Sequence, residues 1–385
     1  MTTPTPPLTV LYFVTEDWYF ISHRLPLAMA AKEAGHEVHV LTRVNSGQQR
    51  IAETGITIHD IPIDRTRLNP VLDVATLIRV IGIVRRIRPD IIHNVALKPV
   101  VYGSIAAKLN SVPFTFNALA GLGYVFSSSE LKAKALKPVV SLALKHLLRR
   151  PSSKAIVQND DDAQILMRIG VPNTSISIVR GSGIDTTQYA PGKEPTGPPV
   201  VAMSARLTED KGVLYFVEAA RILHSKHLVA RFALIGKPDP MNPSSVSVDQ
   251  LQNWNDEGVV EWWGHSDDMP TTLRQTSIAC LPSTYGEGLP KSLLEAGATG
   301  LPIVTTDNPG CRDTVVDGVT GYLVPPRDPE SLAKRVAELV WDKRRRHEFG
   351  IAGRQHVTRH FDVSEVIDAT LRLYAEARPH PRVRR

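Results

Sequence analysis

The sequence predicts an α/β protein with two doubly wound domains, each a parallel sheet covered by helices on both faces. Apolar runs of strand length alternate with helical runs in both halves of the chain, which is typical of βαβ units. At 385 residues the chain is too long for one ordinary core. Between the halves, residues 181–199 are rich in Gly and Pro and have no periodicity, as expected of a linker.

The first half contains six predicted strands and four predicted helices. The strands are residues 8–14, 36–42, 56–63, 90–95, 114–118 and 154–159, and the helices are 23–35, 74–89, 100–110 and 163–170. We assign residues 1–185 to a first Rossmann-like domain and residues 186–199 to the linker. Ligands of such sheets bind beyond the carboxyl ends of the strands, so we expect chemistry at those ends.

The alternation restarts in the second half, which we assign to a domain spanning residues 200–360. Strands are predicted at 200–206, 231–237, 259–265, 278–283 and 301–306, and helices at 212–226 and after Glu287, with Pro290 at the first helical position. Two further helices, 331–350 and 364–377, are separated by residues 354–362. We expect the segment 361–385 to pack back on the first domain, and the two domains to face each other across a cleft.

Composition describes an ordinary globular protein, with 42% hydrophobic and 22% charged residues. The two cysteines, Cys280 and Cys311, lack metal-ligand spacing, so neither a disulfide framework nor a zinc site is expected, and a reducing cytoplasm fits best. The amino terminus has no basic leader, and its apolar run, residues 8–14, is too short for a secretion signal or a membrane span.

Net charge points to an anionic partner or to an excess of surface arginine, since the formal charge is +6 and the pI is near 9.3. Seven basic residues gather around the apolar stretch 138–148: Lys132, Lys134, Lys137, Lys145, His146, Arg149 and Arg150. That segment has the composition of one that lies on an anionic bilayer. We therefore expect a peripheral protein at the cytoplasmic face of the membrane.

Four charged residues at predicted strand-to-helix junctions of the second domain suggest a ligand site. Arg206 and Lys211 follow one strand and suit a diphosphate, although solvated loop cations are the alternative when the two are taken alone. Glu287 and Glu295 flank a Gly-Leu-Pro turn at the start of a helix, where free backbone amides attract phosphate. Together they describe a site for a nucleoside diphosphate that carries a polyhydroxy group.

Three segments resemble the family-four glycosyltransferases of the GT-B architecture, which retain anomeric configuration: SARLTEDKG (204–212), YGEGLPKSLLEA (285–296) and DGVTGYLVPPRDPESLA (317–333). The resemblance runs nearly end to end, including residues 152–192. It implies that Arg206 and Lys211 neutralise the donor diphosphate, and that Glu287 contacts the donor sugar.

The same resemblance implies that Glu295 binds the ribose hydroxyls of a nucleotide sugar. The backbone of Gly288, Leu289, Pro290 and Lys291 would complete the cradle for the sugar and the phosphates. Preorganised cations and amides of this kind stabilise the charge that builds on a departing diphosphate.

The first half resembles the branch that acts on polyprenyl-diphosphate-linked glycans, through FVTEDWYFISHRLPLA (13–28) and AGLGYVF (120–126). This branch implies that His23 and Arg24 open a helix near the acceptor, and that Gly121 and Gly123 allow close backbone approach to a ligand. Asn117 stands where many relatives have a histidine. His93 and Lys98, expected at a strand end facing the cleft, can receive an acceptor phosphate, or they are a satisfied histidine and a solvated lysine.

The predicted function is sugar transfer from a nucleotide sugar, with UDP as the expected nucleotide, to a lipid-linked glycan. No metal or other cofactor is expected, because Asp160, Asp161 and Asp162 precede a helix and suit its capping. Two alternatives stay open: a nucleotide-sugar 2-epimerase and a non-catalytic partner subunit of the same fold. A nucleic-acid binder is excluded by the scattered basic residues, and a dehydrogenase by the lack of a dinucleotide-binding glycine fingerprint.

Overall fold

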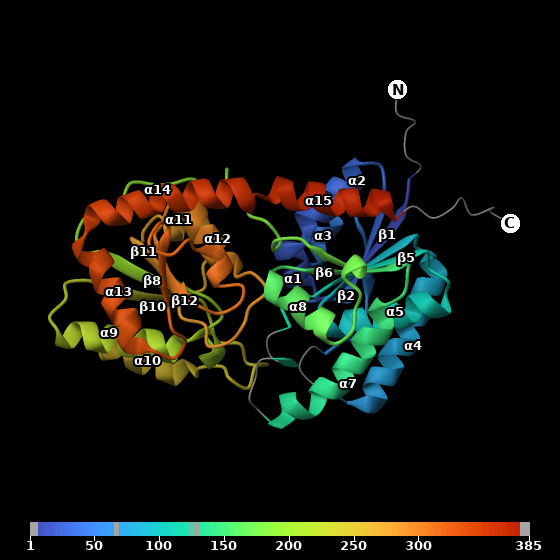
Figure 1. Cartoon of the computed structure of the whole chain (residues 1–385), viewed down its shortest axis with the longest axis horizontal. Coiled ribbons are helices and arrows are strands. Elements are labelled where there is room, and N and C mark those ends of the chain that lie inside the picture. The colour runs from blue at the N-terminus through green and yellow to red at the C-terminus, as the bar shows by residue number, and fades with distance from the viewer. Residues whose placement is uncertain (1–6, 65–68, 120, 123–124, 127–130, 378–385) are drawn as a thin grey trace. The chain divides into compact units, whose positions relative to one another are not determined.

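A computed structural model describes residues 7–64, 69–119, 121–122, 125–126 and 131–377 (Figure 1). The chain folds as two compact units. The first comprises residues 1–120, 129–182 and 364–385, and the second comprises residues 121–128 and 183–363. Each unit is built on one parallel sheet, so the predicted fold class is confirmed.

The sheet of the first unit has the strand order β3-β2-β1-β4-β5-β6-β7. Its strands are β1 (Thr9–Glu16), β2 (Glu37–Arg43), β3 (Thr57–Asp60), β4 (Ile91–Val95), β5 (Phe114–Ala118), β6 (Ser153–Val157) and β7 (Ile176–Ile178). All neighbouring strands pair in parallel. The order reverses beside β1, so the carboxyl ends of β1 and β4 form the usual binding crevice of such a sheet.

Helices cover both faces of this sheet. They are α1 (Asp17–His23), α2 (Leu25–Glu33), α3 (Gln48–Ala52), α4 (Pro70–Ile87), α5 (Leu97–Leu109), α7 (Leu131–Leu148) and α8 (Asp160–Arg168). Local signals explain several boundaries: Asn69 caps α4 by accepting from the amides of Val71 and Leu72, and Pro70 takes the first helical position. The helix expected at 23–35 begins only at Leu25, because the chain breaks at Arg24 after the short helix α1.

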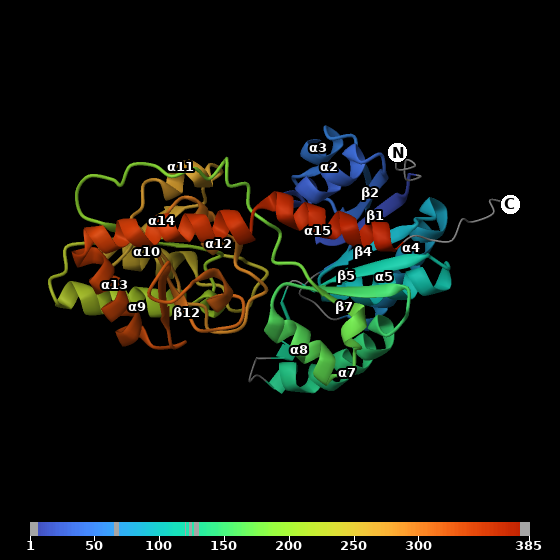
Figure 2. The ribbon, with the colours of Figure 1, turned by 45° about the horizontal axis from the view of Figure 1, so that its top comes forward.

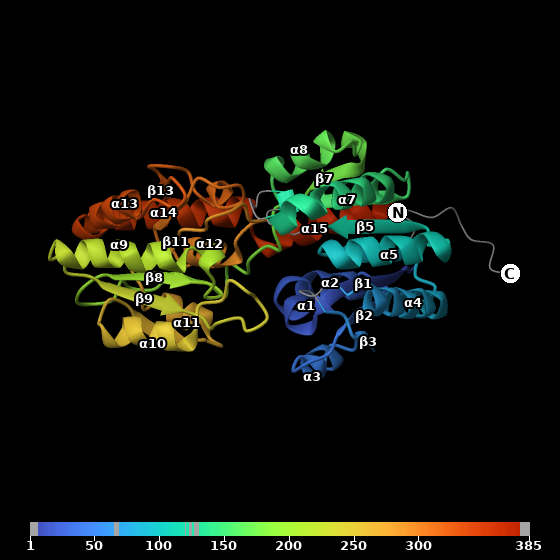
Figure 3. The same cartoon turned by 90° about the horizontal axis from the view of Figure 1, so that it is seen from below.

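The sheet of the second unit has the strand order β10-β9-β8-β11-β12-β13, again with parallel pairing throughout. Its strands are β8 (Val200–Ser204), β9 (Arg231–Ile235), β10 (Glu261–Gly264), β11 (Ile278–Leu281), β12 (Ile303–Thr306) and β13 (Gly321–Val324). The helices are α9 (Val213–Ser225), α10 (Val248–Asp256), α11 (Met269–Leu273), α12 (Lys291–Ala298), α13 (Pro329–Trp341) and α14 (Lys343–His360). Helix α9 packs against α13, and α12 packs against α14 (Figure 3).

The predicted break at residues 354–362 is largely wrong. Residues 354–360 continue α14, and the break between α13 and α14 falls instead at Asp342. The carboxylate of Asp342 accepts a hydrogen bond from the amide of Arg345, so this residue ends one helix and caps the next. The chain leaves helical geometry again at Phe361.

Helix α15 (Val363–Glu376) belongs mainly to the first unit, where it lies along the sheet (Figure 2). Tyr374 is 1% exposed, and its hydroxyl contacts Nδ1 of His93 on β4 at 2.6 Å and the hydroxyl of Tyr12 on β1 at 3.1 Å. A carboxyl-terminal helix therefore completes the core of the amino-terminal sheet.

The stretch predicted as a linker begins with residues built into the second unit. Ile184 pairs with Asp362 as an isolated β-bridge, and the hydroxyl of Thr186 donates to a carboxylate oxygen of Asp362 at 2.6 Å. Tyr189 is 6% exposed and belongs to the hydrophobic core of this unit.

Candidate donor site

Lys211 and Glu287 form an ion pair at the carboxyl edge of the second sheet. Lys211 ends a short 3₁₀ turn (Glu209–Lys211) after β8, and Glu287 follows β11. Nζ of Lys211 lies 2.6 Å from Oε1 of Glu287, and the hydroxyl of Ser283 donates to the same oxygen at 2.9 Å. Their side chains are only 15% and 11% exposed. The sheet thus brings together two of the predicted site residues that are 76 positions apart.

Arg206 lies in the same loop and pairs with an acid that the sequence analysis did not include. The guanidinium Nη1 of Arg206 donates a hydrogen bond to Oδ2 of Asp239 at 2.8 Å. Asp239 is 8% exposed and follows β9, and its backbone amide donates a hydrogen bond to the hydroxyl of Ser245 at 2.8 Å. The side chain of Arg206 remains 43% exposed, so it can reach a ligand.

The turn that carries Glu287 rests on a second loop, residues 307–313. The amide of Glu287 donates to the carbonyl of Pro309 at 2.9 Å. Gly310 has φ +79°, and a Cβ there would overlap the carbonyl oxygens of Glu287 and Gly288. Gly212 has φ +84°, and a Cβ there would come even closer to a carbonyl oxygen, that of Pro282. Both positions therefore require glycine.

Glu295 lies one turn into α12 and has different partners. Its Oε1 accepts a hydrogen bond from the hydroxyl of Tyr189 at 2.9 Å, and Nζ of Lys291 lies 3.6 Å from the same oxygen. Burial raises the pKa of the Glu295 carboxyl, and Lys291 and Tyr189 oppose that rise. Helix α12 begins at Lys291, so Pro290 occupies the capping position and not the first helical position predicted for it.

Two residues predicted to contact the acceptor lie in the interior of the first unit. His93 is at the middle of β4 and 2% exposed, so its expected place at a strand end is wrong. Burial lowers the pKa of His93 well below its ordinary value, and the charge of Arg24 acts in the same direction. Asn117 is fully buried, and its amide group is engaged by Asn94, Ser104 and Ser153. That network leaves Asn117 no accessible hydrogen-bonding capacity.

The other predicted acceptor residues have varied surroundings. His23 stacks on Tyr19 with ring centroids 4.1 Å apart, and Arg24 is 5% exposed and lines a small cavity with His93. Lys98 pairs with Asp73 at 3.1 Å. Gly121 groups with the second unit, where a Cβ would come within 2.9 Å of the amide nitrogen of Gly288. Gly123 lies outside the described residues.

The three aspartates at 160–162 form the first turn of α8, so the prediction that they cap this helix is wrong. The capping residue itself is Asn159, whose side chain accepts from the amide of Asp162 at 2.8 Å. Asp160 lies 3.7 Å from Arg180. These carboxylates therefore complement the positive end of the helix dipole.

Helices α4 and α7 of the first unit expose apolar side chains. On α7, Val139 is 67% exposed and Leu142 59%. On α4, Val71, Leu72, Val74 and Ile78 are between 57% and 77% exposed, which the sequence analysis missed. Among the described helices, none is both long and apolar enough to cross a bilayer.

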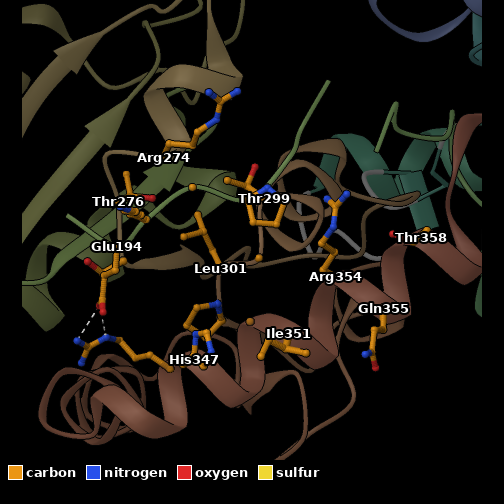
Figure 4. A pocket seen from close by; sticks show the side chains of 18 of the residues that line it. Glu194, Arg274, Thr276, Thr299, Leu301, His347, Ile351, Arg354, Gln355 and Thr358 are labelled. Atoms are coloured by element: carbon orange, nitrogen blue, oxygen red, sulfur yellow. Dashed lines mark hydrogen bonds and ion pairs between the residues drawn. The ribbon is translucent and has the colours of Figure 1, made fainter. Parts of the chain in front are cut away.

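Two hollows of the second unit lie at opposite ends of its sheet. One, of about 540 Å³, is lined at the carboxyl ends of β9 and β10 by residues that include Ile235, Trp263 and His265. The other, of about 570 Å³, lies before the amino ends of β11 and β12 and is lined by Glu194, Arg354 and others (Figure 4). Only the first is at the same edge as Arg206 and Lys211, and the sequence analysis identified neither.

Comparison with known proteins identifies the family of this chain. The family model for "Glycosyl transferases group 1" matches residues 185–356, and the model for "Glycosyl transferase 4-like" matches residues 9–158. The chain is a group 1 glycosyltransferase. The family predicted from the sequence is therefore confirmed, and the matches cover both units.

Named relatives of this glycosyltransferase are transferases as well, which favours neither the epimerase nor the partner-subunit alternative. It is 26% identical over 376 residues to N,N'-diacetylbacillosaminyl-diphospho-undecaprenol alpha-1,3-N-acetylgalactosaminyltransferase of Campylobacter jejuni, covering 92% of this chain and 97% of that one. It is 26% identical over 297 residues to UDP-Gal:alpha-D-GlcNAc-diphosphoundecaprenol alpha-1,3-galactosyltransferase of Escherichia coli, covering 74% of each.

The fold of the glycosyltransferase is similar to that of Alr3699/HepE from Anabaena, solved in complex with UDP and glucose. The TM-score is 0.78 at 15% identity, covering 96% of this chain and 99% of the other. Sucrose-phosphate synthase from Thermosynechococcus elongatus gives the same TM-score of 0.78 at 18% identity, covering 96% of this chain and 98% of that one.

The backbone contact at Gly310 leaves no space for a side chain. Gly310→Ala should destabilise the second unit by about 1 to 3 kcal/mol or more, because φ is positive and the new Cβ has no room. Weaker binding of nucleoside diphosphate should accompany the lower melting temperature, since the turn of Glu287 must move. Gly318→Ala is the matched control: its φ is +72°, but no atom lies within 4 Å of the added Cβ. Equal melting temperatures for the two variants would contradict the prediction.

Proposed function

We propose that this glycosyltransferase moves a sugar from a UDP-sugar to a polyprenyl-diphosphate-linked glycan, with retention of configuration and without a metal ion. The observation that carries the proposal is the nearly end-to-end similarity to a transferase whose name specifies a diphospho-undecaprenol acceptor. The name of the second relative specifies both UDP-Gal and a diphosphoundecaprenol acceptor. The pairing of Lys211 with Glu287 beside Arg206 supplies a site of suitable charge.

The cations of the site suit a diphosphate leaving group. Arg206 is partly exposed and offers a planar fork of donors, while Lys211 offers a compact charge. Lys211 also pairs with Glu287 and neutralises its carboxylate. When a donor diphosphate approaches Lys211, the carboxylate of Glu287 becomes available to accept hydrogen bonds from sugar hydroxyls. Binding of the diphosphate and recognition of the sugar are then coupled through one ion pair.

The remainder of the donor would lie along the carboxyl edge of the sheet. Glu295 is assigned to the ribose hydroxyls, because an ionised carboxylate accepts from two neighbouring hydroxyls. The hollow lined by Trp263 and His265 lies at the ends of β9 and β10, on the side of β8 away from Glu287. It offers room and an aromatic surface for the nucleobase.

Retention is supported by the linkages in the relatives' names. Both names specify alpha-1,3 transfer, and one specifies UDP-Gal as the donor. UDP-galactose is itself an alpha-glycoside, so an alpha product keeps the donor's configuration. The same stereochemistry is proposed for this chain.

Activity measured with defined substrates tests the function. Purified protein should transfer sugar from a UDP-sugar to a short-chain polyprenyl-diphosphate glycan in excess EDTA, and UDP-sugars should stabilise it against heat more than GDP-sugars do. Product should form only when both donor and acceptor are present, whereas an epimerase needs no acceptor. Loss of turnover in EDTA that manganese restores would contradict the metal-free proposal, and a preference for guanosine donors would contradict the UDP proposal.

Substitution of the two glutamates should have different effects. Glu287→Gln should lower turnover while UDP still binds, since the sugar and not the nucleotide is its proposed partner. Glu295→Gln should weaken UDP itself by on the order of tenfold to a hundredfold, because one charge-assisted hydrogen bond is worth roughly 1.5 to 3 kcal/mol. Calorimetry with UDP and a turnover assay on both variants measure the difference. Equal weakening of UDP binding by the two substitutions would refute the assigned roles.

A membrane-bound acceptor requires the protein to reach a lipid surface, and we propose that α4 and α7 provide the contact. Both helices expose large apolar side chains, and Lys134, Lys137 and Arg149 are exposed on or beside α7. Apolar side chains flanked by cations suit an anionic bilayer. This arrangement extends the predicted lipid segment from α7 to α4.

Reversal of charge tests the lipid surface. The triple exchange of Lys134, Lys137 and Arg149 to Glu should weaken binding to vesicles with anionic lipid by tenfold or more at low salt, since each cation near the surface contributes about 1 kcal/mol. UDP affinity should not change. The charge-matched control exchanges Lys226, Lys334 and Lys343, all exposed in the second unit, and should bind vesicles as the unaltered protein does. If the two triple exchanges weaken vesicle binding equally, the proposal that α7 contacts the lipid is wrong.

A further inference from the structure

Tyr189 lies in the stretch that the sequence marks as a linker, yet its hydroxyl reaches the donor site. The tyrosine is 6% exposed and Glu295 is 9% exposed. The hydroxyl donates to Oε1 of Glu295 at 2.9 Å, across 106 positions of sequence. We propose that Tyr189 is a positioning residue for donor binding, which orients the Glu295 carboxylate toward the ribose of the nucleotide. The inference rests on the proposed role of Glu295.

The geometry of the carboxylate explains how a hydroxyl can orient it. The hydrogen bond from Tyr189 at 2.9 Å and the ion pair with Lys291 at 3.6 Å both involve Oε1 of Glu295. A carboxylate held through one oxygen cannot rotate freely, so its second oxygen keeps a fixed direction. A ligand hydroxyl that donates to Oε2 then finds a preorganised acceptor, which lowers the entropy cost of binding.

The backbone of Tyr189 is anchored, so the hydroxyl has a fixed origin. Its amide donates to the carbonyl of Asp185 at 3.1 Å, and the guanidinium of Arg354 on α14 donates to the carbonyls of Tyr189 at 3.0 Å and Thr186 at 3.1 Å. Arg354 projects from α14 at the wall of the 570 Å³ hollow (Figure 4). The tyrosine ring itself packs in the hydrophobic core of the second unit.

A buried tyrosine hydroxyl needs a partner for stability alone, so the test must separate positioning from packing. Tyr189→Phe keeps the ring and removes only the hydroxyl. If the hydroxyl acts through the ribose contact, the substitution weakens ligands that carry ribose hydroxyls and spares those that lack them. If it serves packing alone, both ligands weaken equally or not at all.

Calorimetry with UDP and with 2′,3′-dideoxyuridine diphosphate makes this distinction. In the unaltered protein UDP should bind more tightly than the dideoxy analogue, and Tyr189→Phe should reduce that ratio by about three- to tenfold, the equivalent of one neutral hydrogen bond. Affinity for the dideoxy analogue should stay the same. In the Glu295→Gln background, Tyr189→Phe should add no further loss of UDP affinity.

Tyr322→Phe is the matched control, because Tyr322 is also buried in this unit but its hydroxyl accepts from Arg345 at 3.0 Å. It should leave both affinities unchanged. An unaltered UDP-to-dideoxy ratio in Tyr189→Phe would overturn the positioning role and leave the proposed function intact. Failure of the unaltered protein to prefer UDP over the dideoxy analogue would overturn both the positioning role and the assignment of Glu295 to the ribose.

Discussion

Close contact between backbone segments at the carboxyl edge of the second sheet is the constraint on which the donor site depends. Gly212 meets the carbonyl of Pro282, and Gly310 meets the carbonyls of Glu287 and Gly288, at distances that exclude a Cβ. The loops after β8, β11 and β12 are thereby drawn together. Only this packing places Lys211 within 2.6 Å of Glu287, because the two side chains come from different strand ends. Glycine at these positions is therefore a requirement of the charged site.

Much of the fold follows from hydrophobic periodicity, because parallel strands covered on both faces are continuous apolar runs. The segments TVLYFV in β1 and VVAMS in β8 are recognisable as strands from such runs. The shortest elements lack such a run: β7 has only three residues, and α1 follows β1 without a turn signal. The break between α13 and α14 is hard to predict because Asp342, which ends one helix and caps the next, stands between helix-forming residues. No glycine or proline marks the boundary in WDKRRRHEFG.

The candidate site was predictable only where charge and strand ends coincide. Arg206, Lys211, Glu287 and Glu295 carry signals that are local in sequence. Asp239 and Tyr189 carry none, since their partners are 33 and 106 positions away. The polar side chains of His93 and Asn117 lie inside the first unit for a related reason. In a strand buried on both faces, polar residues need not mark the exposed end, and here they serve a hydrogen-bonded interior instead.

Positive and negative side chains are paired throughout the candidate donor site. Three cations at the candidate site each contact an acid: Arg206 pairs with Asp239, Lys211 with Glu287, and Lys291 with Glu295. A diphosphate must therefore compete with carboxylates that already neutralise these cations. Under the proposed function, a sugar nucleotide offsets this competition, because its hydroxyls supply hydrogen-bond donors to the carboxylates that the cations release. Nucleoside diphosphate without a sugar leaves Glu287 competing for Lys211, so the same ion pair that binds the donor also favours release of the product.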